Sequence, residues 1–228
     1  MLDGRPDAEN LTELESRLIT CRRCERLVEW RERVGREKRR AFQDEIYWAA
    51  PVPGFGDPTA RILLLGLAPG AHGSNRTGRM FTGDASGDFL FPALHRAGLA
   101  SRTRSRSRDD GLTLQGVFIS AAARCAPPGN KPLPQELVNC APWLAAELAF
   151  LPKLRVVLAL GRIAHDAWLR LTREPVSSVN FRHGGEAQVG SLVLLDSYHV
   201  SRQNTNTGRL TTAMFDAVLE RAKLLAGI

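Results

Sequence analysis

Four short apolar runs constrain the fold of this 228-residue chain more than any other feature. They lie at residues 61–65, 117–120, 156–160 and 192–195, and their apolar residues are nearly continuous rather than alternating with polar ones. Strands with this pattern are typical of a parallel sheet that is buried on both faces. Helical patterns lie between them at 87–97, 135–150 and 163–172, and another at 211–225 closes the chain. The alternation predicts a three-layer α/β/α domain with a central, mainly parallel sheet of four strands.

No internal repeat or clean domain boundary interrupts this pattern, so we expect one domain over residues 1–228. A hydrophobic content of 43% and a charged content of 24% are ordinary for a globular protein. No apolar run reaches the roughly 18 residues of a membrane-spanning helix. The polar N-terminal stretch MLDGRPDAENLTELE lacks the basic and apolar regions of a signal peptide, which predicts a cytoplasmic protein.

The chain has a net charge of +7, and its positive charge is clustered. Residues 31–40 read RERVGREKRR, and residues 101–110 form an Arg/Ser-rich segment that contains Arg102, Arg104, Arg106 and Arg108. A basic surface indicates a polyanionic partner, although a solvated arginine-rich surface explains the charge equally well. The second segment reads as a surface loop, which either contacts DNA phosphates or is an inert insertion.

Four cysteines form two groups, a C-x2-C pair at Cys21 and Cys24 and a C-x14-C pair at Cys125 and Cys140. Structural disulfides are rare in cytosolic proteins, and four thiolates suit a tetrahedral zinc ion or an iron–sulfur cluster. The wide second spacing is not a zinc knuckle and favours a cluster. The alternative is that Cys125 and Cys140 are buried core thiols.

The cysteines lie on three separate elements, so a metal centre there would clamp the fold. An amphipathic helix capped by Asn10 or Thr12, with Thr12 and Glu15 in capping-box spacing, is expected to end at Cys21. Cys125 follows the second apolar run, and Cys140 lies in the helical pattern at 135–150. No chemistry at the centre is required for such a structural role.

Three polar loops follow strands of the predicted parallel sheet and should therefore open at the same edge. The first reads GLAPGAHGSNRTGRMFTGD at residues 66–84, the second covers 125–131 and the third 197–208. The first loop lacks both the Gly-Lys-Ser/Thr of a Walker A motif and GxGxxG, which disfavours a nucleotide cofactor. In the third loop, Ser201, Arg209 and nearby backbone N–H groups suit a phosphate, and His199 suits a developing oxyanion. A polar loop with a capping role is the alternative.

Together, the first loop, the segment RCAPPGNKPLPQE, the segment HVSRQNTNTGRLT and the four cysteines resemble the uracil-DNA glycosylase superfamily. The match is most similar to family 5, its iron–sulfur branch with broad specificity, and runs from about Cys21 to the last helix. The resemblance implies removal of deaminated bases from DNA by hydrolysis of the N-glycosidic bond. It also implies a structural [4Fe–4S] cluster on Cys21, Cys24, Cys125 and Cys140, with DNA as the partner of a monomeric protein.

The resemblance also assigns roles to individual residues. Asp84 resembles the acid that assists the attacking water, and His199 the histidine that faces the carbonyl oxygen of the base. Phe81 resembles the aromatic side chain that stacks on the base, and Asn130 the amide that reads its edge. The first motif, whose backbone lies against the base, comprises Gly66, Leu67, Ala68, Pro69 and Gly70. The third motif places Ser201, Arg202, Gln203, Asn204 and Arg209 against DNA.

Each assignment has a structural alternative. Asp84 is also placed to cap the helix expected from residue 87, and Asp88 is a competing acid. Phe81 is equally suited to a core position, and Asn130 to a turn after Pro-Pro-Gly. His72 and Asn75 suit either loop shaping or the site. His95, His165 and His183 lie outside the motifs, and we expect structural roles for them.

The sequence departs from the superfamily pattern at several positions. Leu67 is apolar where family 4 carries an acid, and Gln203 stands where much of the superfamily has a leucine that wedges into DNA. We therefore expect a roomier pocket that accepts hypoxanthine and xanthine as well as uracil. Lys131 is the one lysine in the motifs, and we expect no Schiff base and a monofunctional enzyme. The alternative from another class is a metal-clamped nucleic-acid-binding protein without catalysis; an iron–sulfur sensor is a third hypothesis.

Overall fold

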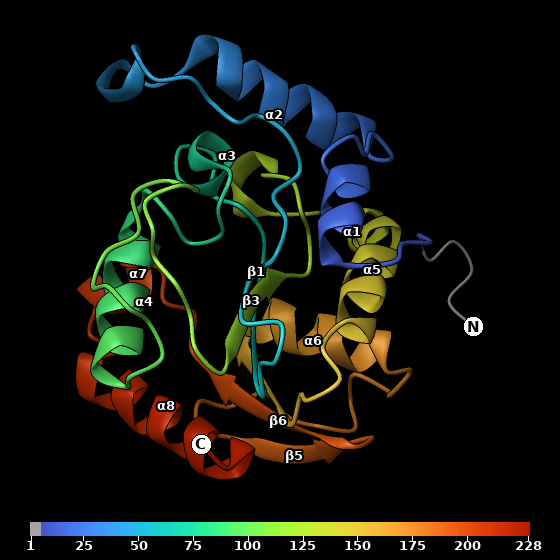
Figure 1. Ribbon diagram of the computed structural model, residues 1–228, viewed down its shortest axis with the longest axis vertical. Helices are drawn as coiled ribbons and strands as arrows, with labels where there is room; N and C mark the ends of the chain where they lie inside the picture. Colours follow the sequence, from blue (N-terminus) through green and yellow to red (C-terminus); the bar gives the residue numbers. More distant parts are fainter. Residues whose placement is uncertain (1–5) are drawn as a thin grey trace.

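The computed structural model describes residues 6–228 and shows a six-stranded sheet between two layers of helices (Figure 1). The strand order is β1-β3-β2-β4-β6-β5. The strands are β1 (Phe55–Gly56), β2 (Ile62–Gly66), β3 (Val117–Ala121), β4 (Val156–Leu160), β5 (Glu186–Val189) and β6 (Leu192–Ser197). Strands β2, β3, β4 and β6 pair in parallel, and β1 and β5 are antiparallel edges. The first five residues of the predicted leaderless N-terminus lie outside the described residues.

The three-layer α/β prediction is confirmed, and the four predicted strands form the parallel centre of the sheet. Every residue of β2, β3 and β4 is buried, because helices cover both faces. The two edge strands were missed. β1 has only two residues, and β5 reads EAQV with exposed Glu186 and Gln188, so neither has a continuous apolar run.

Alternate side chains of β2 enter the two layers of the core. Ile62 and Leu64 pack in one cluster with α4 (Ala85–Arg96) and α8 (Thr212–Ala226). Leu63 and Leu65 pack in the other with α5 (Pro134–Ala149) and α6 (Arg162–Leu171). All four side chains are fully buried, which stabilises the fold by about 1.5–3 kcal/mol each relative to exposure.

Helix α1 (Leu11–Leu18) is shorter than the sequence predicts. Asn10 is its N-cap, and the Asn10 Oδ1 accepts a hydrogen bond of 2.9 Å from the Glu13 N–H. Thr12 lies inside the first turn, so the expected Thr12–Glu15 capping box is wrong. The helix ends at Leu18, so Cys21 lies beyond its end and not at its last residue.

Helix α2 (Glu25–Glu37) was not predicted, although it contains much of the basic run at 31–40. Its buried side is formed by Leu27, Val28, Arg31 and Val34. An arginine at a buried position of this face obscures the apolar period in the sequence. In Figure 1, α2 crosses above α3 (Ser74–Thr77), and the 3-10 helix η1 (Arg40–Phe42) follows it.

A buried ion pair joins the end of β3 to α5. The Arg124 Nη2 lies 2.6 Å from the Glu147 Oε2, and the two side chains are 1% and 6% exposed. The Ser120 hydroxyl donates to the same oxygen at 2.6 Å. Removing one partner of such a pair leaves a buried charge without compensation. The contact therefore fixes the backbone directly before Cys125.

Membrane-spanning helices are absent from residues 6–228. None of the helices there combines the length and the apolar character that a bilayer crossing requires.

Candidate active site

The three predicted loops do meet at one edge of the sheet, because β2, β3 and β6 run parallel within it. Backbone hydrogen bonds hold the starts of the first two loops together. The Ala122 N–H donates to the Gly66 carbonyl at 3.0 Å, and the Ala123 N–H to the Leu67 carbonyl at 2.9 Å. The start of the third loop is held to β4, since the Gly161 N–H donates to the Ser197 carbonyl at 2.8 Å.

Phe81 connects the first loop to the third. Its ring lies against the backbone of Gly66, where a Cβ atom would come within 2.7 Å of the Phe81 Cζ. The Phe81 and His199 rings have centroids 6.2 Å apart and planes inclined at 34°. Phe81 has a φ of +53°, which an aromatic residue rarely adopts, and the residue is only 9% exposed. Most of the Phe81 side chain is therefore packed in the core, as the structural alternative expects. Its contact with His199 places it at the candidate site as well.

Asp84 caps α4 with one carboxylate oxygen. The Asp84 Oδ1 accepts hydrogen bonds from the Ser86 N–H at 3.0 Å and the Gly87 N–H at 3.2 Å. The other oxygen, Oδ2, points at the first loop, where Cβ atoms at Gly73 and Gly70 would lie 2.1 and 2.7 Å from it. The capping alternative is thus confirmed for Oδ1, while Oδ2 faces the glycine backbone. Only residues without a side chain allow this approach.

The environment sets the protonation of the two expected catalytic groups. Burial raises the pKa of Asp84, and the N–H groups of Gly87 and Ser86 partly offset this effect. Burial lowers the pKa of His199 to about 4. His199 is therefore neutral at pH 7, and one of its two ring nitrogens carries a hydrogen. The competing acid Asp88 is exposed and contributes to the raised pKa of Asp84.

Arg76, which the motifs did not identify, holds the two halves of the first loop together. Its guanidinium donates to the His72 carbonyl at 2.8 Å and to the Gly83 carbonyl at 3.0 Å. It also pairs with Glu45 and stacks 3.9 Å from the centroid of the Phe42 ring. Arg76 is only 9% exposed. Its position as a charged residue inside a glycine-rich loop is the sequence signal that could have identified it.

His72 and Asn75 shape the loop through contacts with the N-terminal segment. The His72 Nδ1 lies 3.1 Å from the Tyr47 hydroxyl. The Asn75 Nδ2 donates to the Arg31 carbonyl at 3.2 Å, which connects the loop to α2. These contacts support the loop-shaping alternative for both residues.

The other three histidines have structural surroundings, as expected. The His165 Nδ1 on α6 lies 2.8 Å from the Asp196 Oδ1 on β6, and both side chains are buried. His183 stacks on Tyr198 with ring centroids 5.0 Å apart, and His95 is exposed on α4.

Asn130 ends the short 3-10 helix η2 (Pro128–Asn130). It has a φ of +57° and is exposed, which fits the turn alternative for its backbone. Among residues 6–228, no hydrogen bond engages its side-chain amide. The amide is free for a ligand, and its role in reading a base stays a prediction.

The third loop continues into α7 (Arg202–Asn206), which the sequence did not predict. The Ser201 side chain caps this helix, and the Asn204 Nδ2 donates to the His199 carbonyl at 2.8 Å. The Arg209 guanidinium lies 4.7 Å from the centroid of the Tyr198 ring. Arg202 and Gln203 are exposed. The loop is therefore structured by its own polar residues, and its expected DNA contacts stay predictions.

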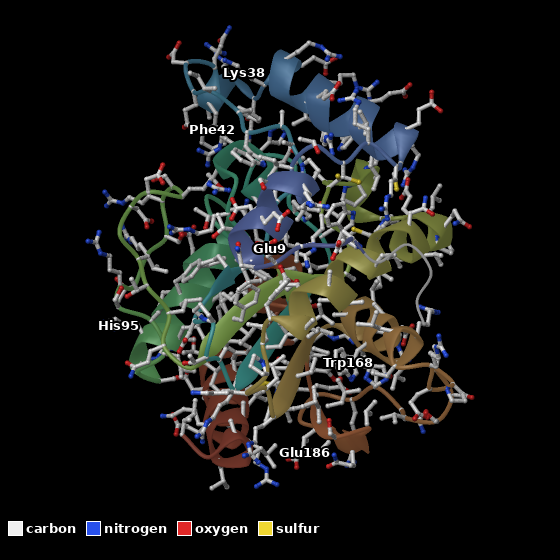
Figure 2. All side chains as sticks on the ribbon, turned by 45° about the vertical axis from the view of Figure 1, so that its right-hand side comes forward. Glu9, Lys38, Phe42, His95, Trp168 and Glu186 are labelled. Carbon is white, nitrogen blue, oxygen red and sulfur yellow. The ribbon has the colours of Figure 1, made fainter. Side chains whose placement is uncertain are left out.

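All four cysteines carry free thiols and line one small cavity between α1, α2 and α5. Figure 2 shows sulfur atoms gathered at this place. Three N–H donors point at them: Arg31 Nη1 to Cys125 at 2.8 Å, the Arg124 backbone N–H to Cys140 at 3.2 Å, and Asn139 Nδ2 to Cys24 at 3.5 Å. The four cysteines therefore share one cavity, and their role as metal ligands stays a prediction.

The donor set fits an iron–sulfur cluster. Within the described residues, no group of three or more His, Cys, Asp or Glu side chains is close enough together to hold a metal ion. The fit rests on the four thiols in one cavity and on the N–H donors that point at them. The four cysteines would supply the thiolate ligands of a cluster, and N–H donors to these thiolates would tune its reduction potential. Burial raises the pKa of Cys125 to about 11 and that of Cys140 to about 12, so ionised thiolates there need a compensating cation.

Comparison with known proteins identifies the family of this chain. A family model described as the uracil DNA glycosylase superfamily matches residues 53–223. The chain is 61% identical over 212 residues to the type-5 uracil-DNA glycosylase of Thermus thermophilus, and the match covers 92% of this chain and 96% of that protein. The type-5 uracil-DNA glycosylase of Mycobacterium leprae is 50% identical over 231 residues, covering 100% of both. A type-4 uracil-DNA glycosylase of Sulfurisphaera tokodaii is 28% identical over 222 residues, covering 94% of this chain and 86% of that protein.

The fold and the family match define an enzyme of the DNA glycosylase class. The chain belongs to the uracil DNA glycosylase superfamily, and its full-length relatives of type 5 confirm the resemblance to family 5.

The two roles of Asp84 predict different stabilities for two substitutions. Asp84→Ala removes the cap and should lower the free energy of unfolding by about 1 kcal/mol, whereas Asp84→Asn keeps an equally good cap.

Because burial raises the folded-state pKa of Asp84, the ionised carboxylate is disfavoured in the fold. The wild type should therefore gain stability relative to Asp84→Asn as the pH falls through the raised pKa toward the ordinary carboxyl value. Urea denaturation across this pH range measures both effects; equal stability of the two variants would contradict the capping role.

Proposed function

We propose that this chain removes uracil from DNA by hydrolysing its N-glycosidic bond and leaves an abasic site. The observation that carries the proposal is the contact between the Phe81 and His199 rings. Phe81 lies three residues before Asp84 on the same loop. It gathers an aromatic surface, a neutral donor and a carboxylate at the carboxyl edge of a parallel sheet, where ligands of such folds bind.

Binding begins with extrusion of the target nucleotide, because the duplex hides the bond that is broken. Extrusion costs a few kcal/mol, and stacking on an aromatic ring offsets it by about 1–3 kcal/mol per base. Phe81 supplies this ring at the rim of the core. The backbone of residues 66–70 gives the base close access, since Gly66 already lies in contact with the ring.

Bond cleavage places positive charge on the sugar and negative charge on the leaving base, by analogy with other glycosides. The neutral His199 donates a hydrogen bond to the carbonyl oxygen of the base, which gains charge as the bond breaks. The Asp84 Oδ2, free of the helix cap, orients the water that attacks the sugar. Asn130 reads the edge of the base with its unengaged amide.

Selectivity is proposed to be broad, with hypoxanthine and xanthine accepted as well as uracil. The apolar Leu67 supplies no acidic side chain that could discriminate between bases. The exposed Gln203 supplies no apolar wedge to fill the gap that the extruded nucleotide leaves in the DNA stack. Discrimination by a missing hydrogen bond is therefore weaker than in a site built with dedicated polar partners. The reaction is proposed to be monofunctional, because none of the residues to which the proposal gives a role in bond cleavage is a lysine that could form a Schiff base.

We further propose a structural [4Fe–4S] cluster held by Cys21, Cys24, Cys125 and Cys140. When bound, it supplies a cross-link between the N-terminal segment, the loop after β3 and α5 and takes no part in bond cleavage. Arg31 donates to Cys125 and is 2% exposed, so its charge offsets that of the ligating thiolates.

Incubation of the protein with duplexes that contain one uracil or one hypoxanthine tests the activity. Strand breaks should appear only after alkali, because hydrolysis alone leaves an intact backbone with an abasic site. An undamaged duplex of the same sequence is the control. Breaks before alkali would contradict the monofunctional mechanism. Binding of the uracil duplex without abasic sites would replace the glycosylase with the non-catalytic nucleic-acid-binding alternative.

Substitution of Cys125 tests the cluster. Cys125→Ala and Cys125→Ser should both yield colourless protein with little iron or sulfide and a lower thermal unfolding midpoint than the wild type purified in parallel. Iron and sulfide assays and visible absorbance measure the loss. A brown variant with wild-type iron content would show that Cys125 is not a ligand, and stoichiometric zinc in the wild type would overturn the cluster itself.

A further inference from the structure

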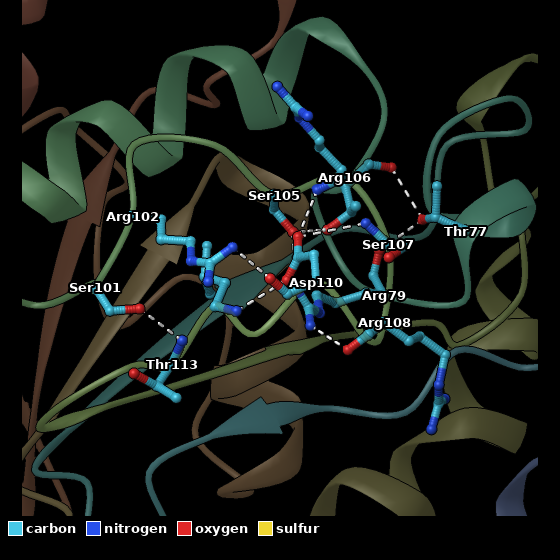
Figure 3. A network of polar contacts seen from close by, with 12 residues as sticks. Thr77, Arg79, Ser101, Arg102, Ser105, Arg106, Ser107, Arg108, Asp110 and Thr113 are labelled. Carbon is cyan, nitrogen blue, oxygen red and sulfur yellow. Dashed lines mark hydrogen bonds and ion pairs between the residues drawn. The ribbon is translucent and has the colours of Figure 1, made fainter.

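The Arg/Ser-rich loop at residues 101–110 is folded around one carboxylate, as Figure 3 shows. Asp110 accepts hydrogen bonds from the backbone N–H groups of Arg106 at 2.6 Å and Leu112 at 2.9 Å. The Arg79 Nη1 lies 2.7 Å from the Asp110 Oδ1, and the two side chains are 7% and 10% exposed. These N–H donors and Arg79 outweigh burial and hold the pKa of Asp110 at about 2. The loop therefore has a defined shape.

The same contacts fix the loop to the candidate active site. The Arg79 Nη1 also donates to the Ser105 hydroxyl at 2.9 Å. The Ser105 hydroxyl lies 2.7 Å from that of Thr82, which is fully buried between Phe81 and Gly83 in the chain. A hydrogen bond thus connects the loop directly to the segment that carries Phe81 and Asp84. These contacts link the loop directly to the site.

Two of the four arginines serve the protein itself. The Arg102 Nη1 donates to the Asp110 carbonyl at 2.6 Å, and Arg108 pairs with Glu15 and stacks 4.6 Å from the centroid of a Trp48 ring. Arg104 and Arg106 are exposed, and no hydrogen bond or ion pair among residues 6–228 engages their guanidinium groups. Figure 3 shows the Arg106 side chain extending away from the network.

We propose that the loop is a second DNA contact, in which Arg104 and Arg106 bind phosphates that flank the extruded nucleotide. The inference rests on the proposed function, because it needs DNA at the site. Free guanidinium groups on a fixed loop bind phosphate oxygens without reading sequence. The contact holds the duplex while the base leaves the stack, a task for which the exposed Gln203 supplies no apolar wedge.

Salt dependence of DNA binding tests this assignment. Each phosphate contact adds about 0.9 to the slope of log K against log salt concentration, so loss of two contacts should lower the slope by about 2. The test variant is Arg104→Gln with Arg106→Gln, measured on duplexes with and without uracil. The slope should fall by the same amount on both duplexes, because phosphate contacts do not read the base. The matched control is Arg155→Gln with Arg170→Gln, two exposed arginines at the start of β4 and the end of α6, which should keep the wild-type slope.

The outcomes separate the inference from the proposed function. An active wild type whose double variant keeps the full slope would overturn the loop contact alone. Wild-type protein that forms no abasic sites would overturn the proposed function. A slope lowered on duplex RNA but unchanged on DNA would assign the loop to RNA and reject the proposal.

Discussion

The parallel pairing of β2, β3, β4 and β6 is the constraint on which the site depends. It brings the ends of β2, β3 and β6 to one edge, so loops that are distant in the sequence become neighbours. The buried pair of Arg124 and Glu147 then fixes the backbone before Cys125, and Arg31 connects that region to Asn75 in the first loop. The cysteine cavity and the candidate active site thus share one framework rather than forming two independent features.

The Asp84 side chain is placed to serve both the fold and the proposed chemistry. Its Oδ1 closes the first turn of α4, and its Oδ2 faces a backbone kept bare by Gly70 and Gly73. A cap that uses one oxygen holds the other in a fixed direction, which is what an orienting carboxylate requires. The choice between helix cap and catalytic group is therefore not exclusive for this residue.

Much of this arrangement could be predicted from the sequence, because buried parallel strands leave continuous apolar runs. The polar edge strand β5 leaves no such run, and Arg31 on the buried side of α2 hides the period of that helix. Contacts between loops, such as that of Arg79 with Asp110, depend on tertiary packing and have no signal in spacing. The approach of Asp84 to Gly73 is of the same kind, since it follows from how the loop folds back.

If Asp84 acts in bond cleavage as well as in capping, the single-turnover rate of Asp84→Asn on a uracil-containing duplex should reveal it. Asparagine keeps the cap and the shape of the loop but cannot orient water as a carboxylate does. With saturating enzyme, we expect a rate lower by about 10²-fold or more, with DNA affinity close to that of the wild type. A rate within about threefold of the wild type would rule out this catalytic role and leave Asp84 as a helix cap only.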